Sequence, residues 1–431
     1  MSLPVYNLFL FLYSLGARLI SPWNPKARLW LAGRKNIFER LSRQIRENKI
    51  TLTGKSPLIW MHCASLGEFE QGRPVLEGIR LANPETRILI TFFSPSGFEI
   101  RKNYSGADFI YYLPMDGAGN AKRFLDIVQP DLVLWVKYEY WFYFLREIKN
   151  RNIPLLLISG LFRKDQVFFK WYGQLYRLML TFFRHLFVQG EPSASLLKTL
   201  SETPPVTVNG DTRFDRVSAI AGTFTPIEEV DAFCKDSPVI VAGSTWQEDE
   251  EELDHYANTH PEIKFIIAPH EIDEAHLKNT ESLFKNTVRF SKWKKIYKNP
   301  RSHSSITQPN VLIIDNIGML SRLYHYATIT YVGGGFGNDG IHNILEAAVY
   351  GKPVFFGPVF DRFLEAIELL ECGGAYTVEN ALELEKSMNN LLENKQEYAE
   401  SCLAALNYTQ QNRGATEAIL GYIRQNQLIQ I

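Results

Sequence analysis

Short apolar runs alternate with helical patterns along most of this chain. From residue 56 onward the runs are rich in β-branched and aromatic side chains, and amphipathic segments separate them. This alternation is typical of doubly wound parallel sheets, in which a helix makes each crossover. The first series is 58–62, 88–93, 109–112, 132–136, 155–158, 185–188 and 206–208, and the second is 239–242, 265–267, 311–314, 328–332 and 354–356.

The two series predict two Rossmann-like domains. A chain of 431 residues is too long for one core, and 213–238 contains no long apolar run. We therefore expect an α/β protein whose two doubly wound domains face a central cleft. The expected parts are 1–50 for a membrane anchor with its basic flank, 51–222 and 223–410 for the two domains, and 411–431 for a C-terminal helix.

The N-terminus predicts a membrane anchor. Leu3–Ile20 is almost entirely apolar, with Arg18 as its one charge, and residues 18–46 carry eight Lys or Arg against the single acid Glu39. No basic segment precedes the apolar run, which argues against a signal peptide. An apolar segment followed by cations fits an anchor whose flank meets an anionic membrane surface. The alternative is a buried amphipathic helix of the first domain.

Composition excludes some classes of function. The formal net charge is −1, which argues against an electrostatic nucleic-acid binder. The four cysteines are widely spaced and form no CxxC pair, which argues against a zinc site or a disulfide framework. The sequence also has no DxD motif, so we expect no catalytic metal.

The segment 332–358 reads as strand, glycine turn, helix and strand. Three glycines, Gly333–Gly335, follow the strand at once, and the pattern predicts a helix over 341–351. The start of such a helix suits a phosphate. Asn343 and Glu346 would share one helical face, where a carboxylate can accept hydrogen bonds from ribose hydroxyls. The alternative is an ordinary turn whose glycines permit tight packing.

Two carboxylates follow strands of the first domain. Glu68 lies where the strand 58–62 gives way to a helix, and Glu139 follows 132–136. Ligands of open α/β sheets bind at such strand ends, and a carboxylate there can take a proton from a hydroxyl. The alternatives are a helix-dipole role for Glu68 and a structural pairing with Lys137 for Glu139.

Three further segments, 209–215, 243–246 and 269–271, are expected near the ligand, and His270 in the last of them could reach it or be an ordinary surface histidine. Arg213 could pair with a phosphate or carboxylate. Ser244 and Thr245 place hydroxyls at a helix start after the strand 239–242. The acidic run 248–252 is interpreted as a solvated face that the helix dipole favours.

In combination these segments resemble the 3-deoxy-D-manno-octulosonic acid (Kdo) transferases, membrane-bound glycosyltransferases of lipid A assembly with the GT-B fold. The resemblance extends over nearly the whole chain. Its most specific part is the glycine turn followed by the segment that ends in Glu346. The motifs that carry it are Ser65–Glu68, Glu139–Trp141, Gly210–Asp215, Ser244–Thr245, Asp315–Leu320, Val332–Gly334 and Gly340–Glu346.

The resemblance implies roles for individual residues. Glu68 matches the general base of the family, and Glu139 matches a second carboxylate of its active site. The implied contacts to the CMP-sugar donor are Arg213, Ser244, Thr245, Gly318, Met319, Gly334, Asn343 and Glu346. The implied reaction is the inverting transfer of Kdo from CMP-Kdo to the lipid A precursor (lipid IVA), in lipopolysaccharide core biosynthesis. It needs no cofactor or metal, and it takes place at the cytoplasmic face of the inner membrane.

The chain departs from the family pattern at several positions near the expected donor. Lys137 replaces a Glu, Trp246 replaces a His, the usual Pro-Arg-His-Pro reads Pro269-His270-Glu271 without the Arg, and 336–339 lacks the usual Arg. Two alternatives stay open. One is another GT-B enzyme, such as a membrane-associated hexosaminyltransferase or a sugar-nucleotide epimerase. The other is a non-catalytic protein that binds a nucleotide sugar.

Overall fold

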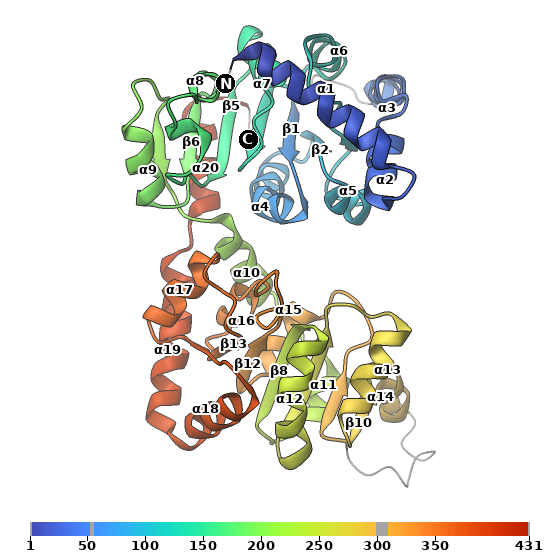
Figure 1. Cartoon of the computed structure of the whole chain (residues 1–431), viewed down its shortest axis with the longest axis vertical. Helices are drawn as coiled ribbons and strands as arrows, with labels where there is room; N and C mark the ends of the chain where they lie inside the picture. The colour runs from blue at the N-terminus through green and yellow to red at the C-terminus, as the bar shows by residue number, and fades with distance from the viewer. Residues whose placement is uncertain (1, 52–55, 299–308, 430–431) are drawn as a thin grey trace. The chain divides into compact units, whose positions relative to one another are not determined.

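The computed structural model describes residues 2–51, 56–298 and 309–429, which form two compact units (Figure 1). Unit 1 comprises Met1–Asp215 and Arg413–Ile431, and unit 2 comprises Arg216–Asn412. The chain therefore leaves unit 1, builds unit 2 and returns. Each unit contains one seven-stranded sheet, so the predicted α/β class with two doubly wound domains is confirmed.

The sheet of unit 1 is parallel and has the strand order β3-β2-β1-β4-β5-β6-β7. The order reverses between β1 and β4, which makes this pair the switch point of the sheet. All seven strands coincide with predicted apolar runs to within two residues. They are β1 (Leu58–Cys63), β2 (Arg87–Phe92), β3 (Phe109–Tyr112), β4 (Leu132–Val136), β5 (Leu155–Gly160), β6 (His185–Val188) and β7 (Val206–Val208).

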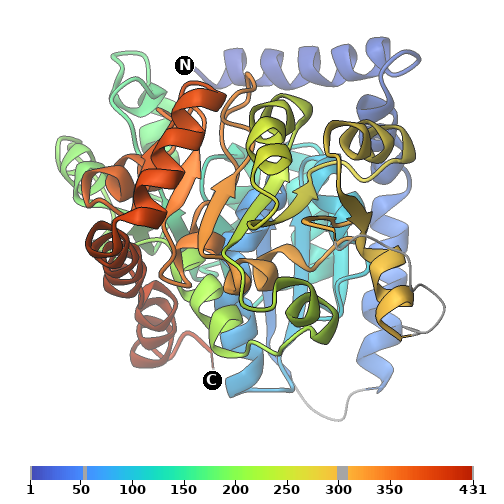
Figure 2. The same ribbon diagram turned by 90° about the horizontal axis from the view of Figure 1, so that it is seen from below.

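Helices cover both faces of this sheet (Figures 1 and 2). They are α1 (Leu3–Ile20), α2 (Pro25–Arg34), α3 (Ile37–Thr51), α4 (Leu66–Ala82), α5 (Pro95–Arg101), α6 (Ala118–Val128), α7 (Phe142–Asn150), the 3₁₀ helix η1 (Val167–Phe169), α8 (Gln174–Leu180), α9 (Glu191–Lys198) and α20 (Ala415–Gln425). A further helix, α10 (Thr212–Gly222), crosses the boundary between the units.

Alternation along β1 divides the core of unit 1 into two layers. Trp60 belongs to the layer that packs under α6 and α7, whereas Ile59 and Met61 belong to the layer under α4 and α20. The C-terminal helix α20 completes that second layer. A Cβ on Gly78 would lie 2.5 Å from Leu420 Cδ1, so the absence of a side chain on α4 permits the close approach of α20.

The sheet of unit 2 repeats this design with the order β10-β11-β9-β8-β12-β13-β14, again all parallel. Its switch point is the pair β8 and β12. The strands β10 and β14, at the two edges, were not predicted. The strands are β8 (Val239–Thr245), β9 (Lys264–Pro269), β10 (Thr287–Arg289), β11 (Val311–Ile313), β12 (Ile329–Val332), β13 (Val354–Phe356) and β14 (Ala375–Thr377).

The helices of unit 2 also lie on both faces of its sheet (Figure 2). They are α11 (Glu228–Cys234), α12 (Gln247–Thr259), α13 (Glu274–Leu283), α14 (Phe290–Lys298), α15 (Leu320–Leu323), the 3₁₀ helix η3 (Tyr324–Tyr326), α16 (Leu345–Ala348), α17 (Leu364–Glu371), α18 (Ala381–Glu393) and α19 (Lys395–Gln411).

Helix α1 packs on unit 1 by one narrow face. Its buried residues are Tyr6 and Leu10. The Tyr6 hydroxyl donates to Asp116 Oδ2 at 2.6 Å and accepts from the N–H of Phe142 at 3.1 Å. Much of the remaining surface of the helix is apolar and exposed, so the alternative of a buried helix does not describe α1. The exposed residues are Val5, Leu8, Phe9, Phe11, Leu12, Tyr13, Leu15, Leu19 and Ile20.

By length and composition α1 is the single described helix able to cross a membrane. Of its 18-residue apolar window, 11% is buried. Core helices and signal sequences can meet the same two criteria, and a core helix would be mostly buried. Length and hydropathy are therefore weak evidence for a membrane segment. The exposure of most of the apolar side chains of α1 is a further observation in favour of one.

Candidate active site

In each unit, several of the predicted site residues lie at the carboxyl ends of strands that flank the switch point. In unit 1, Glu68 follows β1 and Glu139 follows β4. In unit 2, Ser244 and Thr245 end β8, and the glycine turn follows β12. Strand ends at a switch point leave a crevice between crossover helices that wind in opposite directions, which is where open α/β sheets bind ligands.

Glu68 is buried in the first turn of α4, with 6% of the residue exposed. Its Oε2 accepts a hydrogen bond from the N–H of Ala64. Burial raises the pKa of Glu68 to about 8, and the charge of Glu139 adds to the rise, while the Ala64 N–H and Lys137 oppose it. A carboxyl group with a pKa near the working pH is suited to accept a proton from a hydroxyl.

Glu139 is held by aromatic side chains. Its Oε2 accepts from the indole N–H of Trp141 at 3.1 Å and lies 3.4 Å from His62 Nε2. Its backbone carbonyl accepts from the indole N–H of Trp135 at 2.5 Å. Lys137, two residues earlier, has a φ of +52°, a conformation that costs free energy for a non-glycine residue. The turn therefore fixes Glu139 tightly, while 24% of its side chain remains exposed.

His62 is a site residue that the sequence interpretation missed. Its side chain is fully buried, and its Nδ1 lies 3.0 Å from Thr91 Oγ1. It therefore connects Glu139 to the middle of the sheet. The available signal was a histidine at the end of the otherwise apolar strand β1.

Arg213 lies in unit 1, paired with a buried carboxylate. Its Nε donates to Asp211 Oδ2 and its backbone N–H to Oδ1, both at 2.9 Å. Asp211 also accepts from the side-chain amides of Gln71 at 3.0 Å and Gln189 at 2.8 Å. Burial opposes ionisation, but Arg213 and then Lys137 hold the pKa of Asp211 below its ordinary value. Asp211 thus orients Arg213, and the sequence interpretation gave it no role.

The glycines after β12 let two turns of unit 2 touch. A Cβ on Gly333 would lie 2.4 Å from the carbonyl oxygen of Ser244. Gly334 has a φ of +94°, and a Cβ there would lie 2.5 Å from the carbonyl oxygen of Gly340. Tight packing, the alternative interpretation of these glycines, is therefore one of their roles, and it brings the β12 turn against the end of β8.

The helix predicted over 341–351 is wrong in extent. The structure has only the four-residue helix α16 (Leu345–Ala348). The backbone before this helix makes a hydrogen bond outside it: the N–H of His342 donates to the carbonyl of Gly333 at 3.1 Å. Tertiary pairing thus replaces the first helical turns, and a phosphate cradle at the start of a long helix is not what this segment forms.

Asn343 and Glu346 nevertheless come together. The side-chain amide of Asn343 donates to Glu346 Oε1 at 3.1 Å, and Asn343 Oδ1 accepts from the N–H of Leu345 at 3.3 Å. Both side chains are partly exposed. Gly318, with a φ of +95°, and Met319 form a separate turn between β11 and α15, where Gly318 is exposed.

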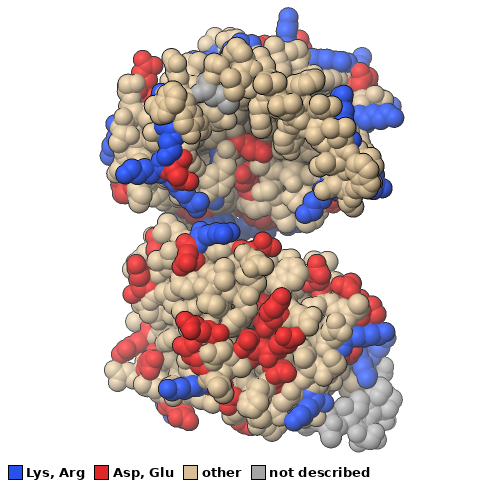
Figure 3. Space-filling model, in the orientation of Figure 1, with Lys and Arg blue, Asp and Glu red and all other residues tan. Residues whose placement is uncertain are grey.

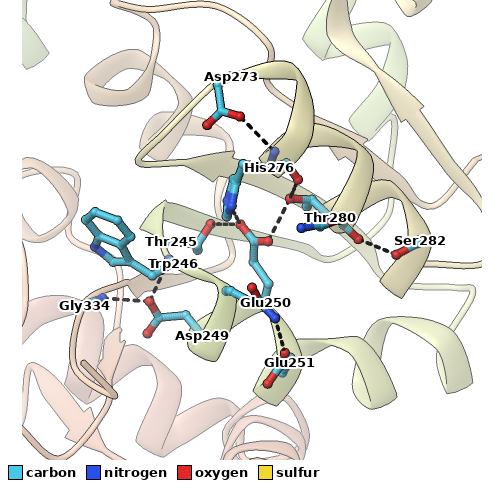
Figure 4. Close-up of polar contacts among 12 residues, drawn as sticks. Thr245, Trp246, Asp249, Glu250, Glu251, Asp273, His276, Thr280, Ser282 and Gly334 are labelled. Carbon is cyan, nitrogen blue, oxygen red and sulfur yellow. Dashed lines mark hydrogen bonds and ion pairs between the residues drawn. The ribbon is translucent and has the colours of Figure 1, made fainter. Parts of the chain in front are cut away.

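The interpretation of 248–252 as a solvated face is wrong for Asp249 and Glu250, which are 0% and 1% exposed. Glu248 and Glu251 are exposed, and Figure 3 shows acidic side chains over α12. Asp249 is one of the connections between the two turns of unit 2. Its Oδ2 accepts from the N–H of Trp246 at 2.9 Å and of Gly334 at 2.8 Å (Figure 4).

Glu250 occupies a second buried network. Its Oε1 accepts from the Thr245 hydroxyl and its Oε2 from the Thr280 hydroxyl, both at 2.8 Å, and His276 Nε2 lies 3.2 Å from Oε1 (Figure 4). The hydroxyl of Thr245 is thus engaged inside the protein. Ser244 is partly exposed, with a φ of +54°.

Comparison with known proteins points to one family. Residues 35–216 match the sequence model of a family described as 3-Deoxy-D-manno-octulosonic-acid transferase (kdotransferase). A 3-deoxy-D-manno-octulosonic acid transferase of Aquifex aeolicus (strain VF5) is 26% identical over 345 residues, which are 79% of this chain and 87% of that protein. The corresponding transferase of Haemophilus influenzae is 25% identical over 380 residues, 85% of this chain and 86% of that protein.

Among solved structures, the UDP-GlcNAc 2-epimerase from Neisseria meningitidis bound to UDP-GlcNAc is similar in fold. It superposes with a TM-score of 0.60 and 19% identity over 85% of this chain and all of the epimerase chain. At that identity the likeness concerns the arrangement of helices and strands alone.

Proposed function

Because this chain is a glycosyltransferase of the Kdo transferase family, we propose that it transfers Kdo from CMP-Kdo to the lipid A precursor lipid IVA. The relatives support Kdo transfer in lipopolysaccharide biosynthesis, and the donor, the acceptor and the inverting course are the proposal. The observation that carries it is Glu68, a buried carboxyl at the switch point of unit 1 whose pKa is about 8.

Glu68 acts as the general base. A carboxylate in a dry environment binds a proton more strongly than one in water, so Glu68 can take the proton as the acceptor hydroxyl attacks the anomeric carbon of Kdo. The bond from that carbon to the CMP phosphate breaks on the opposite face, which inverts the configuration. Glu139, fixed by Trp141 and His62, is the second carboxylate and stabilises positive charge on the sugar in the transition state.

The donor binds to unit 2 at the turns after β8, β11 and β12. We assign the ribose contact to Glu346 with Asn343, and the nucleotide contact to the turn at Gly318 and Met319. Ser244, Thr245 and Gly334 shape the turn that receives the phosphate. Thr245 does so without touching the donor, because its hydroxyl donates to the buried Glu250 and so holds the turn in place. Arg213, oriented by Asp211, supplies positive charge to the phosphate or the sugar carboxylate. No metal takes part in this proposal.

We propose that α1 lies along the cytoplasmic face of the inner membrane. The hydrogen bond from Tyr6 to buried Asp116 attaches one face of the helix to unit 1, and the exposed apolar face is left for the lipid. If α1 spanned the membrane, the hydrogen bond from Tyr6 would be lost and the buried carboxylate of Asp116 would be left without this donor. The exposed cations of α2 and α3 then meet anionic lipid headgroups, and the enzyme works where its lipid acceptor resides. These cations include Lys26, Arg28, Arg43 and Arg46.

One assay tests the proposed reaction. Purified protein is incubated with CMP-Kdo generated in situ and with lipid IVA, in the presence of EDTA, and the lipid product is analysed by mass spectrometry. The expected product is heavier by one or more Kdo residues. A product that forms only from a UDP-sugar would favour the alternative of another GT-B enzyme. Binding of CMP without any product would favour the non-catalytic alternative.

A further inference from the structure

Three rings form a parallel cluster beside the glycine turn. The indole N–H of Trp246 donates to His342 Nε2 at 3.0 Å, and the two ring planes differ by 17°. The two rings thus lie edge to edge. The ring of His270 stacks on both, with centroid distances of 4.6 Å to Trp246 and 4.4 Å to His342. We call Trp246, His270 and His342 the ring cluster.

The hydrogen bond within the ring cluster determines where His342 carries its proton. An indole N–H can only donate, so Nε2 of His342 is the acceptor and the neutral ring carries its hydrogen on Nδ1. Burial, followed by the neighbouring His270, lowers the pKa of His342 to about 4, against the opposing charge of Asp339. The ring is therefore uncharged near neutral pH. His342 is partly exposed, and its Nδ1 has no hydrogen-bond partner in the described part of the chain.

Trp246 is itself held by the carboxylate that holds the glycine turn. Asp249 Oδ2 accepts from the backbone N–H groups of both Trp246 and Gly334 (Figure 4), and Asp249 Oδ1 accepts from the Tyr331 hydroxyl at 2.8 Å. A hydrogen-bonded path therefore runs from the buried carboxylate through Trp246 to His342. His342 directly precedes Asn343, one of the expected donor contacts.

We propose that Trp246 is a positioning residue for the donor site, which fixes His342 as a neutral ring that offers its Nδ1–H to the anionic sugar nucleotide. The proposal rests on the proposed function, because it takes unit 2 to bind the donor. Trp246 and His270 are two of the positions that depart from the family pattern, and both contact His342. This chain thus offers the donor an oriented neutral hydrogen-bond donor at His342.

The first test is Trp246→Phe, which keeps an aromatic ring and removes the N–H. We expect the KM for CMP-Kdo to rise about tenfold with a much smaller change in kcat, because the ring no longer has one preferred orientation and tautomer. Trp246→His, which restores a ring N–H, should recover part of the loss. The matched control is Trp293→Phe, which removes an indole hydrogen bond to the Glu229 carbonyl in the same unit and should leave the KM unchanged.

A second readout is spectroscopic and needs no activity. Long-range ¹H–¹⁵N spectra of protein labelled in its histidines report the tautomer of each ring, and His342→Gln identifies the signal of His342. The wild type should show His342 protonated on Nδ1 and without titration between about pH 5.5 and 8. In Trp246→Phe the ring should populate both tautomers and titrate at a higher pH, because Nε2 is free to accept a proton.

Two results would overturn the inference: an unchanged KM in Trp246→Phe, or a wild-type His342 with its proton on Nε2. Failure of the proposed function would look different, since the wild type would then neither bind CMP nor transfer Kdo. Thermal melting of Trp246→Phe and Trp293→Phe checks that each variant is folded before the comparison is made.

Discussion

Glu68 must lose its proton to act as a base, and its burial opposes that loss. We predict that Glu68→Gln lowers the rate of Kdo transfer by about 10²–10⁴-fold, the usual contribution of a general base. CMP binding measured by calorimetry should survive, because the donor turns belong to unit 2. The matched control is Glu77→Gln on the same helix, where the side chain is 44% exposed. Activity of Glu68→Gln near that of the wild type would exclude Glu68 as the base.

The raised pKa of Glu68 predicts the pH dependence of the reaction. The pKa of about 8 means that kcat/KM should rise with pH and level off above about pH 8. A profile that stays flat over this range would show that no group of such pKa limits the reaction.

The same pKa has a consequence for stability. A carboxyl group whose pKa rises on folding makes its full contribution to the free energy of unfolding at pH values below its ordinary pKa of 4.5. That contribution is lost as the pH rises through about 8. The stability of Glu68→Gln relative to the wild type should therefore grow over this interval, by at most ~5 kcal/mol, in denaturant titrations at several pH values.

Glu346 accepts a hydrogen bond from Asn343 and is the proposed ribose contact. We predict that Glu346→Ala weakens CMP binding by about tenfold or more, the cost of a lost charge-assisted hydrogen bond, as measured by calorimetry. Glu371→Ala, an exposed position at the end of α17, serves as the control. Equal CMP affinities in the two variants would remove Glu346 from the nucleotide site.

At the scale of elements, α12 connects the end of β8 to the turn after β12 through Asp249. Removing a buried carboxylate leaves its donors unsatisfied, so Asp249→Ala should lower the free energy of unfolding by about 2–4 kcal/mol. CMP binding should weaken as well, because both turns lose their common acceptor. Chemical denaturation measures the first effect. Glu251→Ala, an exposed position on the same helix, should change neither quantity.

The central strands were predictable from the sequence because each is a continuous apolar run buried on both faces. The strands β10 and β14 were not, because each is a three-residue edge strand that lacks the Val-Thr-Val pattern of β7. Half-buried Thr287 and Arg289 in β10 give no continuous apolar signal. Helix α16 is shorter than its pattern predicted because a tertiary hydrogen bond from His342 competes with the helix.

The candidate site was predictable in part. Glu68 and Glu139 follow strands, and their position could be inferred from the rule for ligand sites in open sheets. His62, Asp211 and Asp249 were not identified, because their roles depend on partners distant in the sequence. Asp249 also lies within an acidic run, where the pattern does not distinguish a buried carboxylate from its solvated neighbours.

At the scale of the whole molecule, membrane attachment should depend on the exposed face of α1. We predict that the combined substitution of Leu8, Phe11 and Leu12 by Ser moves the protein from the membrane fraction to the soluble fraction, because it removes apolar area that lipid would bury. The Tyr6 contact stays intact, so folding should be preserved. Sedimentation with vesicles that contain anionic lipid measures the effect.

The control for this prediction replaces Leu382 and Leu403, exposed apolar residues of unit 2, by Ser. These changes should leave the distribution unaltered. Full retention on membranes after the α1 substitutions, or after deletion of residues 1–20, would contradict an anchoring role for α1.

The return of the chain to unit 1 has a consequence for biosynthesis. Asp215, where the chain leaves unit 1, accepts hydrogen bonds from the N–H groups of Gly414 and Thr416, where it comes back. Helix α20 then supplies Ile419 and Ile423 to a core layer that also contains β1 and α4. A ribosome makes β1 and α4 before unit 2 and α20 after it, so unit 2 can fold during translation while unit 1 still lacks one of the helices of this layer. Nascent enzyme would thus expose the apolar surface of α4 that α20 covers until α20 emerges.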